Sequence, residues 1–155
     1  MNIVPEYLSK EGLEKFKKEL EHLTTVKRKE IVERIEYAKS LGDLSENSEY
    51  KESREAQGIN EGRIQQLEDI IKRAVIIEKG NNGLVQLGST VKLKKDADGK
   101  IYDYTLVGPE EADISARKIS NKSPIGSALM GKKKGSVVKV SSPTGETKYS
   151  IEEIS

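Results

Sequence analysis

The segment of the sequence best suited to a chemical role is residues 42–50. It contains two carboxylates three positions apart, Asp43 and Glu46. Magnesium ions are typically held by one or two carboxylates, with water or phosphate oxygens completing the coordination. The pair could therefore complete a metal site whose other ligands belong to a second macromolecule. The same spacing also suits a capping box, with Asp43 capping a helix and Glu46 at its third position. Spacing alone leaves both interpretations open.

Composition excludes several other kinds of site. The 155 residues include no cysteine and one histidine, His22, so disulfides, thiolate metal sites, cysteine nucleophiles and multi-histidine metal sites are excluded. With 27 basic and 26 acidic residues, the net charge of +1 argues against a generally basic nucleic-acid coat. The sequence contains no apolar run of membrane-spanning length and no signal-peptide core at residues 1–6. We expect a cytoplasmic protein that does not associate with membranes.

The chain divides near residue 80. Residues 1–79 carry 15 basic and 17 acidic residues, whereas residues 80–155 carry 12 and 9. Glycine and proline separate short apolar runs only after this point, and residues 80–83, Gly-Asn-Asn-Gly, favour a turn over a continuing helix. We predict two domains, 1–79 and 80–155, and an elongated molecule, because hydrophobic residues make up only 34% of the chain.

The first domain is predicted to be an antiparallel helical hairpin that carries the acidic pair at its tip. Leu13, Phe16, Leu20 and Leu23 are spaced as in a coiled-coil seam, and the stripe continues to Leu41 with a slip near residues 27–29. Gly42 suits the end of the first helix. The predicted seam of the second helix is Tyr50, Ala56, Ile59 or Asn60, Ile64, Leu67, Ile71 and Ala74. A hairpin of this length would present its tip without a surrounding pocket.

The second domain is predicted to be a small, mostly antiparallel β-sheet with one short helix, which makes the whole chain α+β. Alternating residues 89–94 precede an Asp98-Gly99 hairpin signal and the strand-like run 101–107. Runs 137–140 and 148–151 flank a turn at residues 143–145. The short helix would be capped by Ser123, begin at Pro124 and end at Gly131.

Several separated motifs together resemble the bacterial GreA/GreB transcript cleavage factors. The most specific is Gly-Asp-Leu-Ser-Glu-Asn-Ser-Glu-Tyr at residues 42–50, which is similar to the tip signature of that family. The resemblance covers almost the whole chain, although Lys29 and Ser48 stand where proline and alanine are usual in the family. The other matching segments are residues 26–28 with 30–31, 61–64 with 67–68, 82–83, and 123–126 through 131–132.

The resemblance implies a fold and a function. It implies a long antiparallel coiled-coil hairpin joined to a domain like the FKBP fold, which docks at the secondary channel of bacterial RNA polymerase. In a backtracked complex, the tip would reach the extruded 3′ end of the nascent RNA. There Asp43 and Glu46 would help to hold the second Mg²⁺ of the polymerase and stimulate cleavage of the RNA. The protein would assist an enzyme, would bind no Mg²⁺ tightly by itself, and would be a monomer when free.

Further residues have both a partner-binding and an ordinary explanation. Arg54, and less strongly Lys51, match the small basic region that contacts RNA in the family, but Arg54 could equally pair with Glu49, Glu52 or Glu55. Ser123, Pro124 and Ile125 match the segment that faces polymerase, but capping and core packing would also explain them.

Three other functions compete with cleavage stimulation. The first is inhibition of polymerase by a channel-binding protein of the same shape, which the two tip acids argue against because inhibitory relatives have altered tips. A prolyl isomerase or chaperone would require an aromatic-lined pocket, and the chain has one phenylalanine and no tryptophan. A plain coiled-coil adaptor would explain the hairpin without explaining the tip signature.

Overall fold

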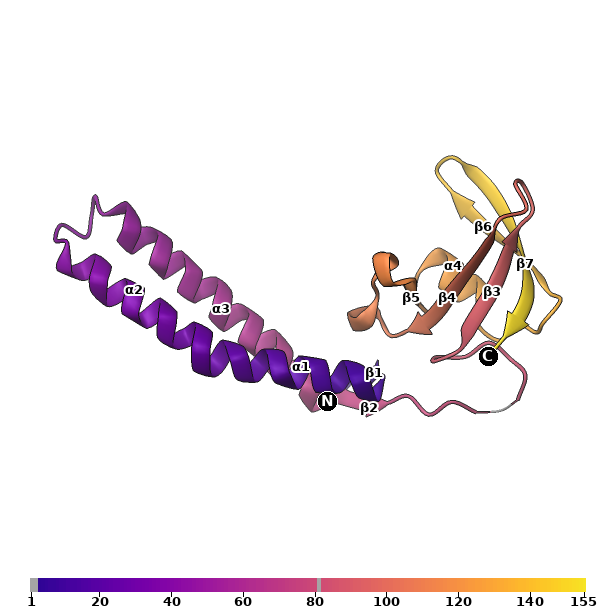
Figure 1. Cartoon of the computed structure of the whole chain (residues 1–155), viewed down its shortest axis with the longest axis horizontal. Coiled ribbons are helices and arrows are strands. Elements are labelled where there is room, and N and C mark those ends of the chain that lie inside the picture. Colours follow the sequence, from indigo (N-terminus) through magenta and orange to yellow (C-terminus); the bar gives the residue numbers. More distant parts are fainter. Residues whose placement is uncertain (1–2, 81) are drawn as a thin grey trace. The chain divides into compact units, whose positions relative to one another are not determined.

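The computed structural model describes residues 3–80 and 82–155, which form two compact units (Figure 1). Residues Glu11–Ala74 make up most of the first unit, and Pro5–Lys10 together with Val75–Ser155 make up the second. The predicted joint at residues 80–83 includes Asn81, which lies outside the described residues. None of the helices in the described part of the chain combines the length and the apolar character needed to cross a membrane.

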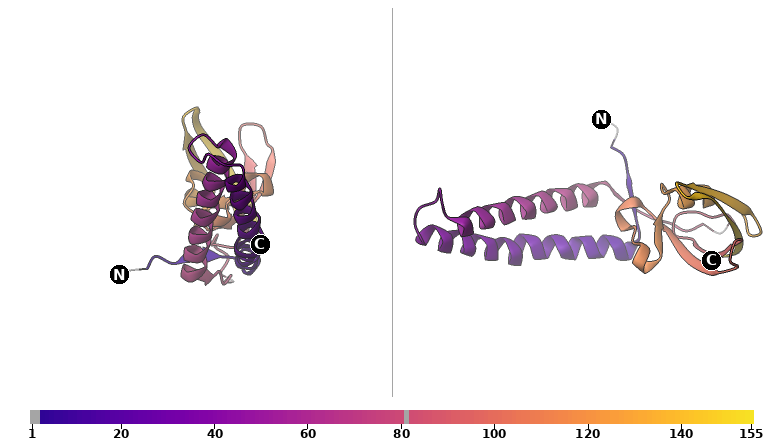
Figure 2. Two further views of the ribbon diagram at one scale, coloured as in Figure 1. Left: turned by 90° about the vertical axis from the view of Figure 1, so that its left-hand side faces the viewer. Right: turned by 90° about the horizontal axis from the view of Figure 1, so that it is seen from above.

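The first unit is a helical hairpin, as predicted. One arm consists of α1 (Lys10–His22), a π-helical turn (Leu23–Lys27) and α2 (Arg28–Ser40), and the other arm is α3 (Ser48–Arg73). The two arms lie side by side (Figure 2). The buried apolar residues of the hairpin alternate along the facing sides of the arms: Phe16, Ile31, Ile35, Ala38, Ile64, Leu67 and Ile70.

Two residues of the predicted stripe, Val26 and Leu41, are corrected by the structure, and the open choice between Ile59 and Asn60 is decided. Val26 and Leu41 are 46% and 58% exposed, because Val26 lies within the π-helical turn and Leu41 follows the last residue of α2. Of the alternatives Ile59 and Asn60, the polar residue faces the seam, with Asn60 buried and Ile59 68% exposed.

The π-helical turn accounts for the slip in the apolar stripe. The backbone N–H of Arg28 donates to the carbonyl of Leu23 five residues earlier, which inserts one extra residue into the helical turn. Thr24 Oγ1 donates to the Leu20 carbonyl at 2.9 Å, and Thr25 Oγ1 donates to the Glu21 carbonyl at 2.7 Å. These hydroxyls supply bonds to carbonyls near the irregular turn.

Side chains of α3 hold the other arm in register. Asn60 Nδ2 donates to the Leu23 carbonyl at 3.2 Å, so the buried amide is satisfied by the π-helical turn. Arg28 forms two hydrogen bonds with Glu61, and Arg63 forms two with Glu19. Such bidentate pairs fix the relative position of the two arms more strictly than a single hydrogen bond does.

The second unit contains a five-stranded sheet with strand order β5-β4-β3-β7-β6. Strands β3 (Thr90–Lys95), β4 (Ile101–Val107), β6 (Val137–Ser142) and β7 (Gly145–Ile154) contain the predicted runs, and their neighbouring pairs are antiparallel. The α+β class is therefore confirmed. The sequence patterns did not predict β5 (Lys118–Ser120), which pairs in parallel with β4 and makes the mostly antiparallel sheet mixed.

The parallel pair arises from the path between β4 and β5. Parallel neighbours need a connection that returns the chain to the same end of the sheet. Two short 3₁₀ turns, Pro109–Glu111 and Ile114–Ala116, provide that return. They lack the apolar periodicity of a crossover helix, so no clear sequence pattern predicts the parallel strand.

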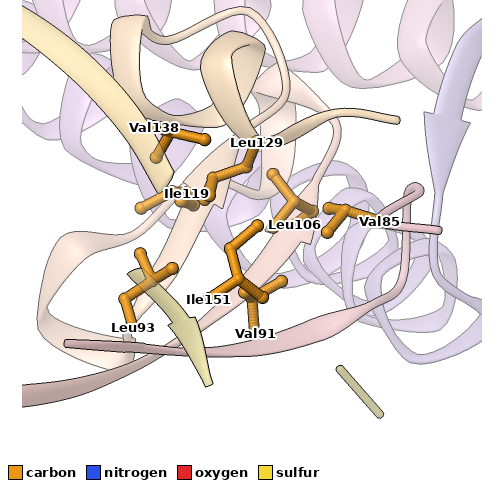
Figure 3. Close-up of a cluster of buried hydrophobic side chains, with 8 residues drawn as sticks. All are labelled: Val85, Val91, Leu93, Leu106, Ile119, Leu129, Val138 and Ile151. Atoms are coloured by element: carbon orange, nitrogen blue, oxygen red, sulfur yellow. The ribbon is translucent and has the colours of Figure 1, made fainter. Parts of the chain in front are cut away.

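The core of the second unit is aliphatic. Its eight buried side chains converge between the sheet and α4 (Pro124–Leu129), as shown in Figure 3. Tyr104 and Tyr149 are only partly buried against this cluster, so the core does not provide the aromatic lining that proline binding favours. The cluster consists of Val85, Val91, Leu93, Leu106, Ile119, Leu129, Val138 and Ile151.

The N-terminal segment adds a small two-stranded sheet that sequence patterns missed. Strand β1 (Glu6–Leu8) pairs with β2 (Ala74–Ile76), and Leu8 is fully buried. The backbone N–H of Ser9 donates to the Glu111 carboxylate at 2.7 Å, and the Ser9 hydroxyl donates to its other oxygen. The segment is therefore tied to residues about one hundred positions away.

Helix α4 begins at the predicted residue and ends at Leu129, two residues before the predicted end at Gly131. Ser123 Oγ accepts a hydrogen bond from the Gly126 backbone N–H at 3.1 Å, Pro124 is the first helical residue, and Gly131 has a φ of +76°. Gly126 is required by a close approach, because a Cβ there would lie 1.9 Å from the Ser120 carbonyl oxygen.

Gly126→Ala is expected to destabilise the second unit by about 2 kcal/mol or more, because the added methyl group must displace backbone. Calorimetric unfolding of the whole protein measures this effect. Ser127→Ala, an exposed change on the same helix, is the control and should shift stability by less than about 0.5 kcal/mol. Equal melting of both variants would contradict the close approach.

The Arg28–Glu61 pair predicts a pH-dependent contribution to hairpin stability. The hydrogen bond from Arg28 lowers the pKa of Glu61 from its ordinary value of 4.5. A lowered carboxyl pKa contributes stability above the unfolded-state pKa, and this contribution disappears as the pH falls through the folded-state pKa. Wild type should therefore melt higher than Glu61→Gln at pH 7, and the difference should shrink below about pH 4.5.

Helical circular dichroism followed during heating at each pH tests this prediction. Glu14→Gln, which removes a carboxylate from a pair within α1, is the matched control. A wild-type advantage that grew on acidification would contradict the assigned sign.

Candidate functional site

The tip of the hairpin is a short loop between α2 and α3. At the end of α2, the N–H groups of Leu41 and Gly42 donate to the Ala38 and Lys39 carbonyls. Gly42 and Asp43 then both have positive φ angles, +84° and +28°. Glycine adopts this region freely, and aspartate tolerates it better than most residues. This pair of residues reverses the chain direction.

The two acids lie in a turn before the helix, and the capping-box interpretation is wrong. The Glu46 backbone N–H donates to the Asp43 carbonyl at 3.3 Å, which closes a turn over residues 43–46. Helix α3 begins later, at Ser48, and its cap is Asn47, whose Oδ1 accepts from the Tyr50 N–H at 3.0 Å. Asp43 is therefore not required as a helix cap.

Both carboxylates are exposed at the tip. Ser45 Oγ donates to Asp43 Oδ1 at 2.8 Å, which orients one carboxylate. Within the described residues, the Glu46 carboxylate has no hydrogen bond or ion pair. No group of three or more acidic, histidine or cysteine side chains suitable for a metal occurs in that part of the chain. The oxygen donors suit Mg²⁺, but two carboxylates can share an ion and cannot enclose one.

Apolar side chains accompany the acids, which the sequence patterns did not predict. Leu44, between the two acids in sequence, is 45% exposed, and Tyr37 near the end of α2 is 63% exposed. Together with Leu41 they give the loop and the adjoining helix end an apolar component. The tip therefore combines two anionic groups with exposed hydrophobic surface.

The basic candidates lie on α3. Arg54 is exposed and donates to Gln57 Oε1 at 2.8 Å, within its own helix. It forms no ion pair in the described part of the chain, so the proposed pairing with Glu49, Glu52 or Glu55 is not present. Glu49 instead lies 3.4 Å from Arg34. Lys51 is exposed.

The remaining candidates, Ser123, Pro124 and Ile125, belong to the second unit. Ser123 caps α4 and also donates to the Ser120 carbonyl at 2.6 Å. Pro124 is exposed, and Ile125 is partly buried against the aliphatic core. Local structure thus accounts for Ser123 and Ile125, whereas the ring of Pro124 remains on the surface.

Two polar residues at the base of the tip were not singled out from the sequence. Asn47 contacts both helices, with Nδ2 2.7 Å from the Ala38 carbonyl oxygen and 3.1 Å from that of Gly42. Ser53 is fully buried, and its hydroxyl donates to the Tyr50 carbonyl at 2.9 Å. Asparagine is a strong N-cap residue, so Asn47 offered a signal in competition with Asp43.

Two known protein families match almost the whole chain. Residues 6–76 match the family described as "Transcription elongation factor, N-terminal", and residues 80–155 match "Transcription elongation factor, GreA/GreB, C-term". The chain belongs to the GreA/GreB family of transcription elongation factors.

Curated relatives agree over nearly the full length. Transcription elongation factor GreA of Clostridium novyi is 48% identical over 149 residues, covering 95% of this chain and 94% of the relative. The GreA protein of Clostridium beijerinckii is 49% identical over 143 residues, covering 91% and 89%. Among solved structures, GreA factor homolog 1 of Thermus thermophilus is 30% identical, with 98% and 99% coverage and a TM-score of 0.46.

The tip geometry predicts that Asp43→Asn and Glu46→Gln fold like the wild-type protein, within about 0.5 kcal/mol, because both side chains are exposed. Asp43→Ala should cost about 1 kcal/mol more than Asp43→Asn, because alanine tolerates positive φ poorly. Thermal melting followed by helical circular dichroism measures these differences, with Ser48→Ala as the control. Equal stability of Asp43→Ala and Asp43→Asn would contradict the strained backbone.

Proposed function

We propose that this protein enters the secondary channel of bacterial RNA polymerase and stimulates cleavage of backtracked RNA. The observation that carries the proposal is the placement of Asp43 and Glu46 in one exposed turn at the end of a hairpin. Membership of the GreA/GreB family supports the same function. The protein would supply side chains to an active site that belongs to polymerase, and would not be an enzyme by itself.

The chemistry requires the acids to be available to a partner. Asp43 and Glu46 offer oxygen ligands that a second, weakly held Mg²⁺ in the polymerase site would accept. When bound, that ion would supply a Lewis acid for activating water and stabilising the leaving oxygen in the hydrolysis of an internal phosphodiester. Glu46, with no competing contact in the described residues, would also accept a hydrogen bond from the attacking water. The Asp43 carboxylate accepts a hydrogen bond from Ser45, so it would need less reorientation than the Glu46 carboxylate on binding the ion.

Basic residues on α3 would contact the extruded RNA. Arg54 is exposed, and its guanidinium bonds only to a neutral amide in the described part of the chain. A guanidinium without a carboxylate partner can bind phosphate or stack on a base. Lys51, one helical turn nearer the tip, would add a weaker phosphate contact.

The second unit would provide the docking surface. We assign residues 1–79 to the tip-bearing domain and 80–155 to the docking domain, with Ser123, Pro124 and Ile125 at the contact with polymerase. Exposure of Pro124 supports this assignment, because an apolar ring on a rigid helix start suits a protein contact. The free protein would be a monomer, and its location would be the cytoplasm, where bacterial polymerase works.

Removing either tip charge should abolish most of the stimulation while leaving polymerase binding intact. Asp43→Asn and Glu46→Gln are expected to lower the rate of stimulated cleavage by at least about tenfold, equivalent to about 1.4 kcal/mol of barrier. The assay uses a stalled, backtracked polymerase complex with 5′-labelled RNA and Mg²⁺. Shortened transcripts that can be extended again identify cleavage.

The controls separate chemistry from binding. Glu55→Gln removes an exposed carboxylate from α3 and should cleave like wild type. Competition for polymerase should give similar affinities for all these variants. Loss of binding in step with cleavage would contradict the metal-assisting role, and slower elongation without shortened RNA would favour a channel inhibitor.

A further inference from the structure

Asn47 uses its whole side-chain amide to connect the two helices at the tip. Nδ2 donates to the carbonyls of Ala38, in the last turn of α2, and Gly42, in the loop. Oδ1 accepts from the Tyr50 N–H in the first turn of α3. The residue is half-buried. One neutral side chain thus satisfies backbone groups at the end of one helix, in the loop, and at the start of the next helix.

The bond to Gly42 bears directly on the orientation of Asp43. The Gly42 carbonyl and the Asp43 N–H belong to one planar peptide unit. The hydrogen bond from Asn47 Nδ2 to that carbonyl, at 3.1 Å, therefore restrains the orientation of this peptide plane. The φ angle of Asp43, +28°, is the rotation of its backbone relative to the same plane. A non-glycine residue in this region of backbone space persists where surrounding contacts enforce it.

The restraint extends from Asp43 to Glu46. The Glu46 N–H donates to the Asp43 carbonyl, and Ser45 Oγ donates to the Asp43 carboxylate. Asn47 follows Glu46 directly, so its contacts with α2 close the loop from the other side. The turn that carries both acids is enclosed between Gly42 and Asn47, and the Asn47 amide joins these two residues.

We propose that Asn47 is a positioning residue for the cleavage reaction, acting through the backbone of Asp43 and Glu46. This inference rests on the proposed function and deepens it, because Asn47 itself would touch neither RNA nor metal. Its two donor bonds are the essential part, since they restrain the loop, whereas its acceptor bond serves the helix cap. Acids held in one geometry lose less conformational freedom when they join the polymerase site.

Two substitutions separate the donor bonds from the cap. Asn47→Asp keeps an oxygen that accepts from the Tyr50 N–H, but at neutral pH its carboxylate cannot donate to the Ala38 and Gly42 carbonyls. Asn47→Ser also keeps a capping oxygen and adds no charge, but its hydroxyl lacks the two amide hydrogens and is shorter. Ser48→Ala, at the first residue of α3, is the matched control because its side chain is exposed.

Backbone dynamics of the free protein provide the first test, independent of cleavage. Nitrogen-15 relaxation should give order parameters near about 0.85 for residues 43–46 in wild type and in Ser48→Ala. In Asn47→Asp and Asn47→Ser the values should fall below about 0.6, the range of flexible backbone, while α3 stays rigid. Unchanged order parameters in both variants would overturn the proposal.

Cleavage by the backtracked polymerase complex provides the second test, as a function of Mg²⁺ concentration. Both Asn47 variants should cleave at least about tenfold more slowly at limiting Mg²⁺, because displaced ligands lose much of their effect. Higher Mg²⁺ should restore part of the rate, with polymerase affinity unchanged. A merely structural role would lower melting temperature and affinity without shifting the Mg²⁺ dependence, and that result would overturn the proposal.

The two tests also distinguish this inference from the proposed function. Wild type that fails to stimulate cleavage would overturn the proposed function, and with it the catalytic part of the inference, while the relaxation data would still decide whether Asn47 fixes the tip. Active wild type with equally active and equally rigid Asn47 variants would overturn the inference alone.

Discussion

The tip depends on the three hydrogen bonds of a single amide. Asn47 donates to carbonyls of Ala38 and Gly42 and accepts from the Tyr50 N–H. The end of one helix and the start of another each leave backbone groups unsatisfied, and a loop this short has few side chains to satisfy them. Because Asn47 supplies both a donor pair and an acceptor, the carboxylates of Asp43 and Glu46 are released from capping and remain available to a partner. The residue that satisfies the backbone groups at the tip is thus distinct from the two acids.

Contacts along the rest of the hairpin fix the position of the two arms that carry the tip. Apolar contacts such as Ile35 with its neighbours bury the seam, but apolar packing by itself tolerates sliding. The two-pronged pairs Arg28–Glu61 and Arg63–Glu19 are directional and fix which residues of the two arms face each other. A turn held by Asn47 on arms held in register gives the acids a defined place, and the proposed function depends on such a placement.

Sequence patterns predicted the large features because these follow from periodicity. The hairpin, four strands of the main sheet and the capped helix after Ser123 each have an apolar repeat or turn residues of their own. The patterns failed where two nearby residues are suited to the same local role. Asp43 and Asn47 are both good caps, and only the three-dimensional path shows that Asn47 takes the role. Strands β1 and β5 were missed because their partners are set by tertiary contacts such as Ser9 with Glu111, far apart in sequence. The resemblance assigned the acids a metal-assisting role, which stays a prediction, whereas spacing could not choose between cap and ligand.

The π-helical turn at residues 23–27 determines the directions in which the side chains of α2, between this turn and the loop, point. Each residue of an α-helix advances the direction of its side chain by about 100°. The additional residue in this turn therefore rotates α2 relative to α1 by about that angle, compared with an uninterrupted helix. If the same sequence continued through this point as a regular α-helix, Ile31, Ile35 and Ala38 would turn away from α3, and the acids would point in a different direction. The irregular turn therefore determines the direction in which the tip points. The hydrogen bond from Asn60 on the opposite arm to the Leu23 carbonyl stabilises the turn in this conformation.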